Sequence, residues 1–153
     1  MNIIIRPIQE IDYPRVSLIM DQVHKLHVDW RPDVYKDVNP VISPEDYADM
    51  LKSNEWFVAE ADGVVAGILK LLERHVESSL QKPKNVLHIS TMAVDEQYRG
   101  RGIGHAFFQK VQEIKDQKQF DSIELQVNAK NERAYEMYKK YGFSEKSINM
   151  ELK

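Results

Sequence analysis

The chain has 153 residues, a formal net charge of −3, 42% hydrophobic and 29% charged residues, and no cysteine. This length suits one domain with a full hydrophobic core, spanning residues 1–153. The absence of cysteine excludes disulfides, cysteine-ligated zinc and a cysteine nucleophile, and it fits a cytoplasmic location. The mild charge argues against a nucleic-acid partner, and no apolar run approaches the roughly 20 residues of a membrane span.

An isoleucine-rich segment near the N-terminus, Asn2–Ile8, predicts the first strand. The helix that follows begins at Asp12, whose carboxylate can cap it, and Pro14 falls in its first turn, where proline is tolerated. Apolar side chains then recur at three- and four-residue spacing as far as His27, and Trp30-Arg31-Pro32 interrupts the pattern. The start of the chain therefore predicts a strand followed by a long amphipathic helix.

The middle of the chain predicts a short helix and a β-hairpin. A Ser-Pro-Glu-Asp capping box predicts a helix over Pro44–Lys52. The pair Asp62-Gly63 separates two apolar runs, Trp56–Ala61 and Val64–Leu72, and this pattern is typical of a hairpin. The polar segment Arg74–Asn85 is expected to be a loop.

The second half of the chain alternates predicted strands and helices. The expected elements are, in order, a strand (Val86–Val94), a glycine-rich turn (Gln97–Gly104), a helix beginning near Ile103, a strand (Ser122–Val127), a helix (Asn131–Tyr141) that Gly142 ends, and a final strand or pair of strands (Phe143–Leu152). This order indicates a mixed α/β fold in which helices cover a sheet.

The glycine-rich turn has the composition of a phosphate cradle. Its glycines let the backbone approach a ligand, and the helix N-terminus adds partial positive charge, to which Arg99 and Arg101 add full charges. A P-loop would need Gly-Lys-Ser/Thr, but Gly104 is followed by His105; a dinucleotide fingerprint would need glycine at that histidine position. The alternative is a turn that only reverses the chain.

Two motifs carry a resemblance to a known family. Arg99-x-x-Gly102-x-Gly104, placed after a strand, resembles the acetyl-CoA pyrophosphate loop of the GCN5-related N-acetyltransferases (GNAT family). Asn131-x-x-Ala134-x-x-x-Tyr138-x-x-x-Gly142-Phe143 resembles the downstream motif of that family, and the two motifs cover about Val86–Phe143. The resemblance implies an α/β (α+β) fold: a single GNAT-type domain with a mixed, mostly antiparallel sheet of six or seven strands, helices on both faces, and a splay between strands four and five.

The resemblance also implies acetyl-CoA as co-substrate and no metal. Backbone N–H groups of the glycine turn would hold the pyrophosphate, and the end of strand four would pair with the pantetheine arm and polarise the thioester carbonyl. The expected cofactor-binding residues are Met92, Ala93, Val94, Arg99, Gly100, Arg101, Gly102, Ile103, Gly104, Asn131 and Tyr138.

Acetyl transfer to an amine needs a proton donor for the leaving thiolate and an acceptor for the amine proton. The resemblance assigns the donor role to Tyr138, for which core packing is the alternative. Ser90 stands where the common family pattern has an acidic residue, so His88, expected to share a strand face with Ser90 and Met92, is the candidate base. Alternatively, His88 is a structural histidine of the strand, and Glu60 or a water molecule accepts the amine proton.

Trp30, Asp33 and Tyr35 could bind a cationic amine through ring faces and a carboxylate; equally, Trp30 and Tyr35 could plug an edge of the core. His24 and His27 are spaced three apart on the first helix, and a solvated helix face explains them better than a metal site.

The resemblance therefore predicts an N-acetyltransferase acting by direct attack on a small-molecule or peptide amine. The alternative is a non-catalytic acyl-CoA sensor or protein-interaction module; a homodimer is compatible with the family.

Overall fold

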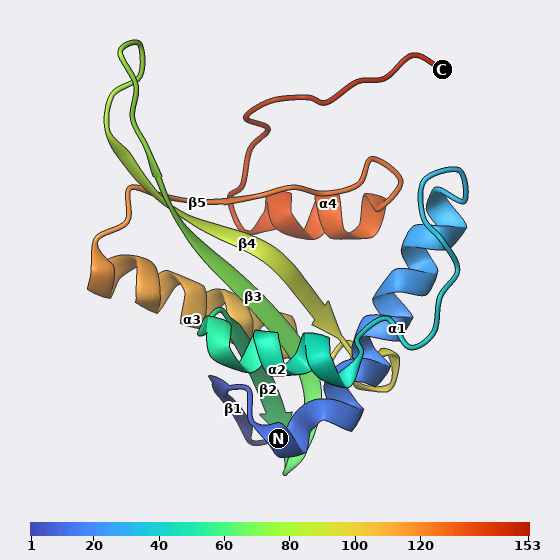
Figure 1. The fold of residues 1–153 in the computed structure, drawn as a ribbon. Helices are drawn as coiled ribbons and strands as arrows, with labels where there is room; N and C mark the ends of the chain where they lie inside the picture. The colour runs from blue at the N-terminus through green and yellow to red at the C-terminus, as the bar shows by residue number, and fades with distance from the viewer.

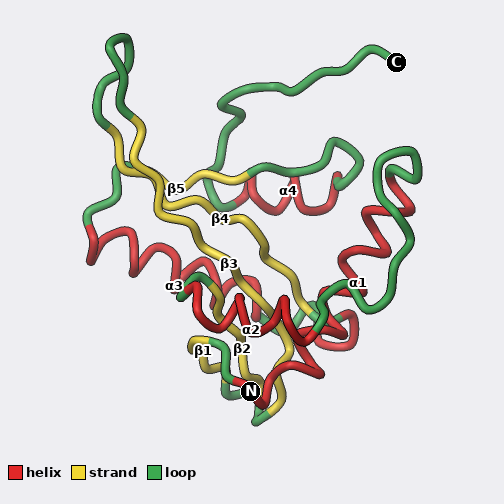
Figure 2. Tube along the Cα trace, in the orientation of Figure 1, coloured by secondary structure: helices red, strands yellow, loops and turns green.

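A computed structural model describes residues 1–153 and shows a five-stranded sheet with helices on both faces (Figures 1 and 2). The strands lie in the order β1-β2-β3-β4-β5, antiparallel except for the parallel pair β4 and β5. The strands are β1 (Ile3–Pro7), β2 (Trp56–Ala61), β3 (Val64–Val76), β4 (Lys84–Val94) and β5 (Ser122–Leu125). The helices are α1 (Tyr13–Trp30), α2 (Pro44–Ser53), α3 (Ile103–Lys118) and α4 (Glu132–Lys140), with short 3-10 helices η1 (Glu10–Asp12) and η2 (Glu96–Tyr98). The predicted fold class is confirmed.

Two hydrophobic clusters fill the space between the sheet and its helices. On one face α1 and α2 pack on the sheet through Val16, Ile19 and Tyr47. On the other face α3 contributes Phe107 and Val111, and side chains of α4 pack at the margin of this second cluster. None of the helices has both the length and the apolar character that a membrane span requires.

Gly67 in β3 allows α3 to approach the sheet closely. A Cβ built at this position would lie 2.9 Å from Phe107 Cε2, 3.0 Å from Ile103 Cγ2 and 3.1 Å from the carbonyl oxygen of Ala93. Contacts this short force neighbouring atoms to move, because protein interiors are close-packed. The glycine therefore sets how deeply the first turn of α3 lies against β3 and β4.

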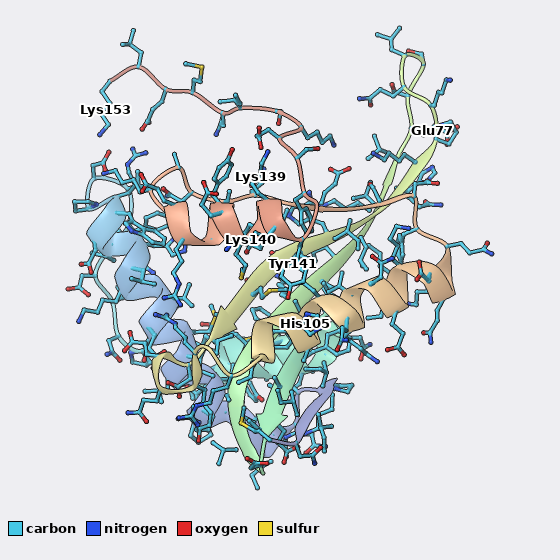
Figure 3. All side chains as sticks on the ribbon, turned by 180° about the vertical axis from the view of Figure 1, so that it is seen from behind. Glu77, His105, Lys139, Lys140, Tyr141 and Lys153 are labelled. Carbon is cyan, nitrogen blue, oxygen red and sulfur yellow. The ribbon has the colours of Figure 1, made fainter.

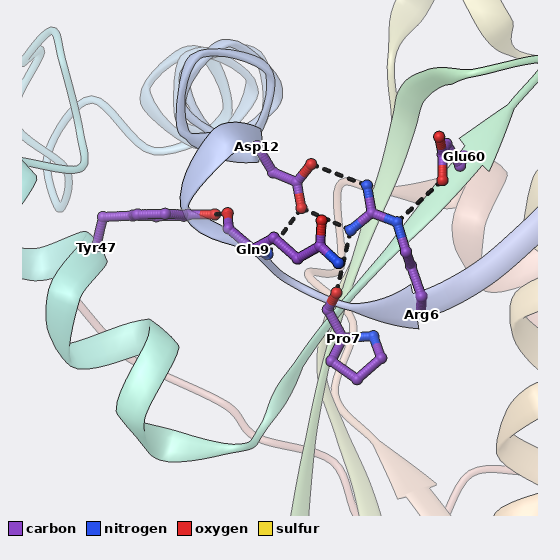
Figure 4. Close-up of polar contacts among 6 residues, drawn as sticks. All are labelled: Arg6, Pro7, Gln9, Asp12, Tyr47 and Glu60. Atoms are coloured by element: carbon purple, nitrogen blue, oxygen red, sulfur yellow. Dashed lines mark hydrogen bonds and ion pairs between the residues drawn. The ribbon is translucent and has the colours of Figure 1, made fainter.

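A partly buried ion cluster joins the N-terminal elements (Figure 4). Asp12 is 3% exposed and accepts hydrogen bonds from Arg6 at 2.8 and 2.9 Å and from the Gln9 N–H at 2.8 Å. Arg6 also donates to Glu60 of β2 at 2.9 Å, and Tyr47 of α2 donates to the Gln9 carbonyl. The prediction that the Asp12 carboxylate caps α1 is therefore wrong, because Arg6 and Gln9 occupy it.

The structure corrects several predicted boundaries. The segment expected to be a loop over Arg74–Asn85 is largely strand, since Glu73 to Val76 pair with Leu87 to Lys84 and only a short turn remains. Cross-strand pairing outweighs the polar composition of this hairpin extension. β5 ends at Leu125, not Val127, because its partner β4 diverges there.

The largest correction concerns the C-terminus. The predicted strand or strands over Phe143–Leu152 are absent, and the sheet has five strands in place of six or seven. Figure 2 shows this segment as a loop that leaves the body of the molecule. Alternation of apolar and polar residues favours a strand only where another strand is available to pair with it.

Candidate functional site

The sheet opens between β4 and β5. Their parallel pairing covers Val86 to Ile89 on β4 and ends at the pair Ile89–Leu125. β4 nevertheless continues to Val94, paired on its other side with Gly67 of β3. The edge of β4 from Ser90 to Val94 is therefore unpaired toward β5, and the expected splay is confirmed. Openings at the carboxyl ends of parallel strands are where α/β proteins bind ligands.

A β-bulge at Ser90 decides which side chains face which side of this splay. Lys70 of β3 pairs with Thr91, but the next residue of β3 pairs with Ile89, so Ser90 is the extra residue. Ile89 and Met92 consequently both lie in the α3 cluster. His88 therefore faces the other side, the α1–α2 side.

The expectation that His88 shares a face with Ser90 and Met92 is thus wrong. Simple alternation along β4 would be correct for a regular strand, but the inserted residue reverses the alternation beyond it. His88 instead shares its face with Thr91 and with Ala93, which packs against the α1–α2 cluster.

His88 pairs with Glu124 of β5, two residues before the unpaired edge of β4 begins at Ser90, and it is 8% exposed. Burial lowers the pKa of its imidazole below the ordinary value of 6.5, the positive charge of Arg74 lowers it further, and Glu124 partly opposes the shift. The ring is therefore neutral at pH 7 and able to accept a proton. Glu60, the other candidate base, lies on β2, and its carboxylate is bound to Arg6.

Tyr138 lies on the opposite side of the sheet from His88. Its ring contacts Phe108 of α3 and Phe143 edge-on, with ring centroids 5.9 and 5.8 Å apart. Burial raises the pKa of the phenol above its usual 10, so the hydroxyl is protonated throughout the neutral range. The residue therefore combines the packing expected of the alternative interpretation with a hydroxyl that can donate a proton.

The turn before α3 presents free backbone donors. The N–H groups from Arg99 through His105 have no hydrogen-bond acceptor within the chain. Gly100 and Gly102 adopt φ values of +75° and +88°, a region that other residues enter only with strain. The guanidinium of Arg101 lies 5.1 Å from the ring of Tyr98, which holds this cation beside the turn. The arrangement suits a phosphate, since donors, helix N-terminus and arginines coincide.

A carboxylate that the sequence analysis missed anchors this turn. Asp95 is 2% exposed and accepts hydrogen bonds from the Gln97 N–H at 3.0 Å, from Gln22 at 3.3 Å and from Arg15. Arg15 also donates to the Val65 carbonyl at 2.9 Å. These contacts join α1, β3 and the beginning of the glycine turn.

Asp95 remains ionised at neutral pH. Burial raises its pKa, but the hydrogen bonds from Gln97, Arg15 and Gln22 outweigh burial and bring the pKa below its ordinary value. The sequence does carry a signal for Asp95. An aspartate that directly follows an apolar strand can cap the next turn, because its carboxylate can accept the N–H of the residue two positions later. Its partners on α1 have no such signature.

Asn131 begins α4 on the far side of the splay. Its side-chain oxygen accepts from the Ala134 N–H at 3.3 Å, which caps the helix. Capping uses the oxygen and leaves the amide hydrogens available to a ligand. The position agrees with a ligand contact, and the cap supplies a structural reason for an asparagine here.

The three predicted acceptor residues divide into two kinds. Trp30 and Tyr35 both contact the ring of His27, at centroid distances of 5.6 and 5.1 Å. Asp33 is bound instead to Arg31 at 2.8 Å and to Lys153 at 3.2 Å, so its carboxylate is neutralised. The structure brings the two aromatic residues together and commits Asp33 to ion pairs.

An aromatic contact joins α3 to the end of α4 through His105 and Tyr141 (Figure 3). His105 Nδ1 and the Tyr141 hydroxyl are 2.8 Å apart, and the Tyr141 ring lies 4.1 Å from that of Phe108. This contact fixes the end of α4 against the first turn of α3, and it agrees with a packing role for Tyr141.

Comparisons with known proteins agree with these features. The family described as "Acetyltransferase (GNAT) family" matches residues 20–143. An N-alpha-acetyltransferase from Sulfurisphaera tokodaii is 35% identical over 122 residues, 72% of this chain and 73% of the relative. A variant of the BH1408 protein from Bacillus halodurans has a TM-score of 0.88 at 27% identity, covering 98% of both chains. AAC(6')-Iy, solved with a bisubstrate analogue containing CoA, has a TM-score of 0.72 at 18% identity and covers 100% of this chain and 98% of its own, which shows the fold alone.

Proposed function

The chain belongs to the acetyltransferase (GNAT) family of acetyl-CoA-dependent N-acetyltransferases, and we propose that it transfers the acetyl group to a primary amine of a small molecule or peptide. The transfer proceeds by direct attack of the amine on the thioester while both substrates are bound. The observation that carries this proposal is the splay between β4 and β5, which has a neutral imidazole on one face and a protonated phenol on the other.

The glycine turn and the free edge of β4 are suited to acetyl-CoA. The unpaired N–H groups between Arg99 and His105 receive the pyrophosphate, with Arg99 and Arg101 supplying charge. The edge residues Met92 to Val94 have no strand partner toward β5, so they can hydrogen-bond an extended pantetheine arm as if it were a strand. The Asp95 N–H donates to the Ala66 carbonyl of β3, so the Ala93 N–H also faces β3 while the Val94 N–H faces the splay, where it polarises the thioester carbonyl.

His88 and Tyr138 divide the proton transfers. The amine nitrogen forms a bond to the carbonyl carbon and loses a proton to His88, directly or through one water. The carbon–sulfur bond breaks, and the hydroxyl of Tyr138 gives its proton to the departing sulfur. Because the two residues lie on opposite faces of the splay, the amine enters on one side while the thiol leaves on the other.

The acceptor enters from the face that carries His88. α1 covers this face, and its end at Trp30 lies beside the segment after β5, since Lys130 Nζ donates to the Trp30 carbonyl at 2.8 Å. Trp30 and Tyr35 therefore form the aromatic wall that receives the amine substrate. Asp33 contributes through its ion pairs, which hold the connection between α1 and α2 in place.

Thiol release from acetyl-CoA, measured against a panel of amines, tests the proposal. The chain has no cysteine, so a thiol reagent reports only free CoA. We expect release that depends on both acetyl-CoA and at least one amine, with acetyl found on the amine by mass spectrometry. Acetyl-CoA binding without release for any amine in the panel would support the alternative, a sensor on the same fold.

A further inference from the structure

Tyr138, the proposed acid, lies on a helix that is not buried in the core. None of the nine residues of α4 is fully buried, and Met137 and Tyr138 pack only at the margin of the α3 cluster. The hydroxyl of Tyr138 has no hydrogen-bond partner in the chain, and burial alone raises its pKa. The direction in which this hydroxyl points therefore depends on how α4 is placed against α3.

Two pairs of side chains determine how α3 and α4 meet. His105 and Phe108 are three residues apart on α3, and Tyr138 and Tyr141 are three residues apart at the end of α4, so each pair lies on one helix face. The Tyr138 ring meets Phe108 edge-on, with centroids 5.9 Å apart. The Tyr141 ring lies 4.1 Å from the same phenylalanine at an angle of 31°. One buried ring of α3 therefore contacts both tyrosines of α4.

His105 supplies the polar contact of this group. Its Nδ1 lies 2.8 Å from the Tyr141 hydroxyl, and the two rings are stacked with centroids 6.0 Å apart. Figure 3 shows Tyr141 between α4 and the beginning of α3, on the side of His105. Tyr141 is 41% exposed, so water reaches this hydrogen bond and the bond adds little to the stability of the fold. What the bond provides is a fixed position for the end of α4.

The same histidine belongs to the turn that is proposed to hold the pyrophosphate. Its backbone N–H is one of the free donors at the beginning of α3, while its side chain holds Tyr141. Tyr141 is joined to Tyr138 through the backbone as well, since the Tyr141 N–H donates to the Tyr138 carbonyl at 3.1 Å. His105 therefore connects the proposed cofactor site to the helix that carries the acid.

We propose that His105 is a positioning residue for Tyr138, an inference that rests on the proposed function. Its hydrogen bond to Tyr141 holds α4 so that the Tyr138 hydroxyl points into the splay, toward the departing sulfur. His105 acts through Tyr141 and takes no part in the proton transfer itself. Displacement of a reacting group by about 1 Å can cost as much as about 100-fold in rate. Loosening α4 therefore slows protonation of the sulfur, while the N–H groups that bind acetyl-CoA stay in place.

Removing the hydrogen bond from either side tests the proposal. Tyr141→Phe deletes the hydroxyl but keeps the ring, and we expect kcat to fall about 5- to 10-fold while KM for acetyl-CoA stays within about two-fold. His105→Leu deletes the same bond, so the double variant should lose no more than either single one. His105→Asn should recover part of the loss, because its side chain places a polar atom near the position of Nδ1. The matched control is Tyr135→Phe, whose hydroxyl contacts Glu145 and not α3; it should keep the wild-type kcat.

A Tyr138→Phe background separates positioning of the acid from general support of the helix. With no acid to position, adding Tyr141→Phe should lower kcat no further. A further loss of the same size overturns the proposal, because a merely structural contact acts whether or not the acid is present.

Two other results overturn it in distinguishable ways. Wild-type kcat in Tyr141→Phe beside a slow Tyr138→Phe removes the positioning role alone. Wild-type kcat in Tyr138→Phe, or no turnover in the wild type, removes the corresponding part of the proposed function and the positioning role with it. Urea denaturation, in which Tyr141→Phe should unfold close to the wild type, shows that the loss of kcat does not come from unfolding.

Discussion

Two regions of the sheet, β2 and β3 on one side and β5 with α4 on the other, differ in how many of their side chains are buried. Around β2 and β3 most side chains are buried, and the Arg6–Asp12–Glu60 cluster ties the first strand, the second strand and η1 together. Around β5 and α4 no residue is fully buried. The first region is a closed scaffold, while the second leaves strand edges and backbone donors without partners. The open region is where the substrates are proposed to bind, because unsatisfied groups can be satisfied by ligands at little structural cost.

His88→Ala breaks the proposed chemistry on one side of the splay and has the largest expected effect. Loss of a general base lowers the rate by about 10²- to 10³-fold at pH 7. Because burial holds the pKa of His88 below 6.5, the wild-type base is active at pH 7 and is lost only as the pH falls through that lowered value. The deficit of the variant shrinks toward pH 9, where more of the amine is already neutral.

The pH–rate profile of kcat/KM measures this deficit. His75→Ala is the matched control, since His75 lies exposed on the outer part of β3 and pairs with Asn85 and Glu77. A profile that His88→Ala leaves unchanged excludes His88 as the base and leaves Glu60 or water as the acceptor.

Tyr138→Phe tests the other side of the splay. It removes the proton donor but keeps the ring contacts with Phe108 and Phe143, so kcat should fall about 100-fold while acetyl-CoA affinity changes little. Steady-state kinetics and calorimetric titration separate the two quantities. Tyr135→Phe on the same helix is the control, because that hydroxyl contacts Glu145 on the surface. Equal turnover in wild type and Tyr138→Phe would remove Tyr138 from the acid role.

Gly67→Ala tests the closed region. The added methyl group would meet Phe107, Ile103 and a backbone carbonyl, so the free energy of unfolding should fall by about 2 kcal/mol. Urea denaturation followed by circular dichroism measures this loss. Gly104→Ala is the control for stability, since a Cβ there meets nothing within 4 Å. A Gly67→Ala variant as stable as wild type would show that α3 can shift outward freely.

Asp95→Asn links the two regions and has a smaller effect. It weakens the anchor between Arg15 and the glycine turn, so the dissociation constant of acetyl-CoA should rise about 10-fold while kcat at saturation stays close to wild type. Asp12→Asn is the matched control: it too removes a buried, arginine-bound carboxylate, but in the N-terminal cluster. Both variants should lose stability, and only Asp95→Asn should lose affinity.

The pH dependence of stability in acid gives the smallest expected effect, and it tests the Asp12 carboxylate of the closed region. The pKa of Asp12 lies below its ordinary 3.8, since Arg6 and the Gln9 N–H outweigh the opposing effect of burial. A depressed folded-state pKa stabilises the fold above the unfolded-state value, and that contribution is lost as the pH falls through the folded pKa. Wild-type stability should therefore decline below about pH 4, and Asp12→Asn should decline less steeply in the same window.

Contiguous sequence was enough to predict the glycine-rich turn before α3 and most elements. The glycines with positive φ, the helix that begins at Ile103 and the capping asparagine at Asn131 depend on neighbours within a few residues, so their local pattern predicts them. The hairpin at Asp62-Gly63 is confirmed for the same reason. The fold class followed from the order of these elements.

Tertiary structure decided what depends on residues far apart in the chain. The register between β3 and β4 places the bulge at Ser90, which turns His88 to the face opposite Met92. The packing of α1 brings Arg15 and Gln22 onto Asp95, and no local pattern encodes that contact. The C-terminal segment Phe143–Leu152 has the alternating pattern of a strand but forms none, because a strand is stable only when the edge of another strand satisfies its backbone groups. Sequence alone thus determined most elements and the glycine-rich turn, whereas pairing and packing decided which segments join the sheet and which side chains face the splay.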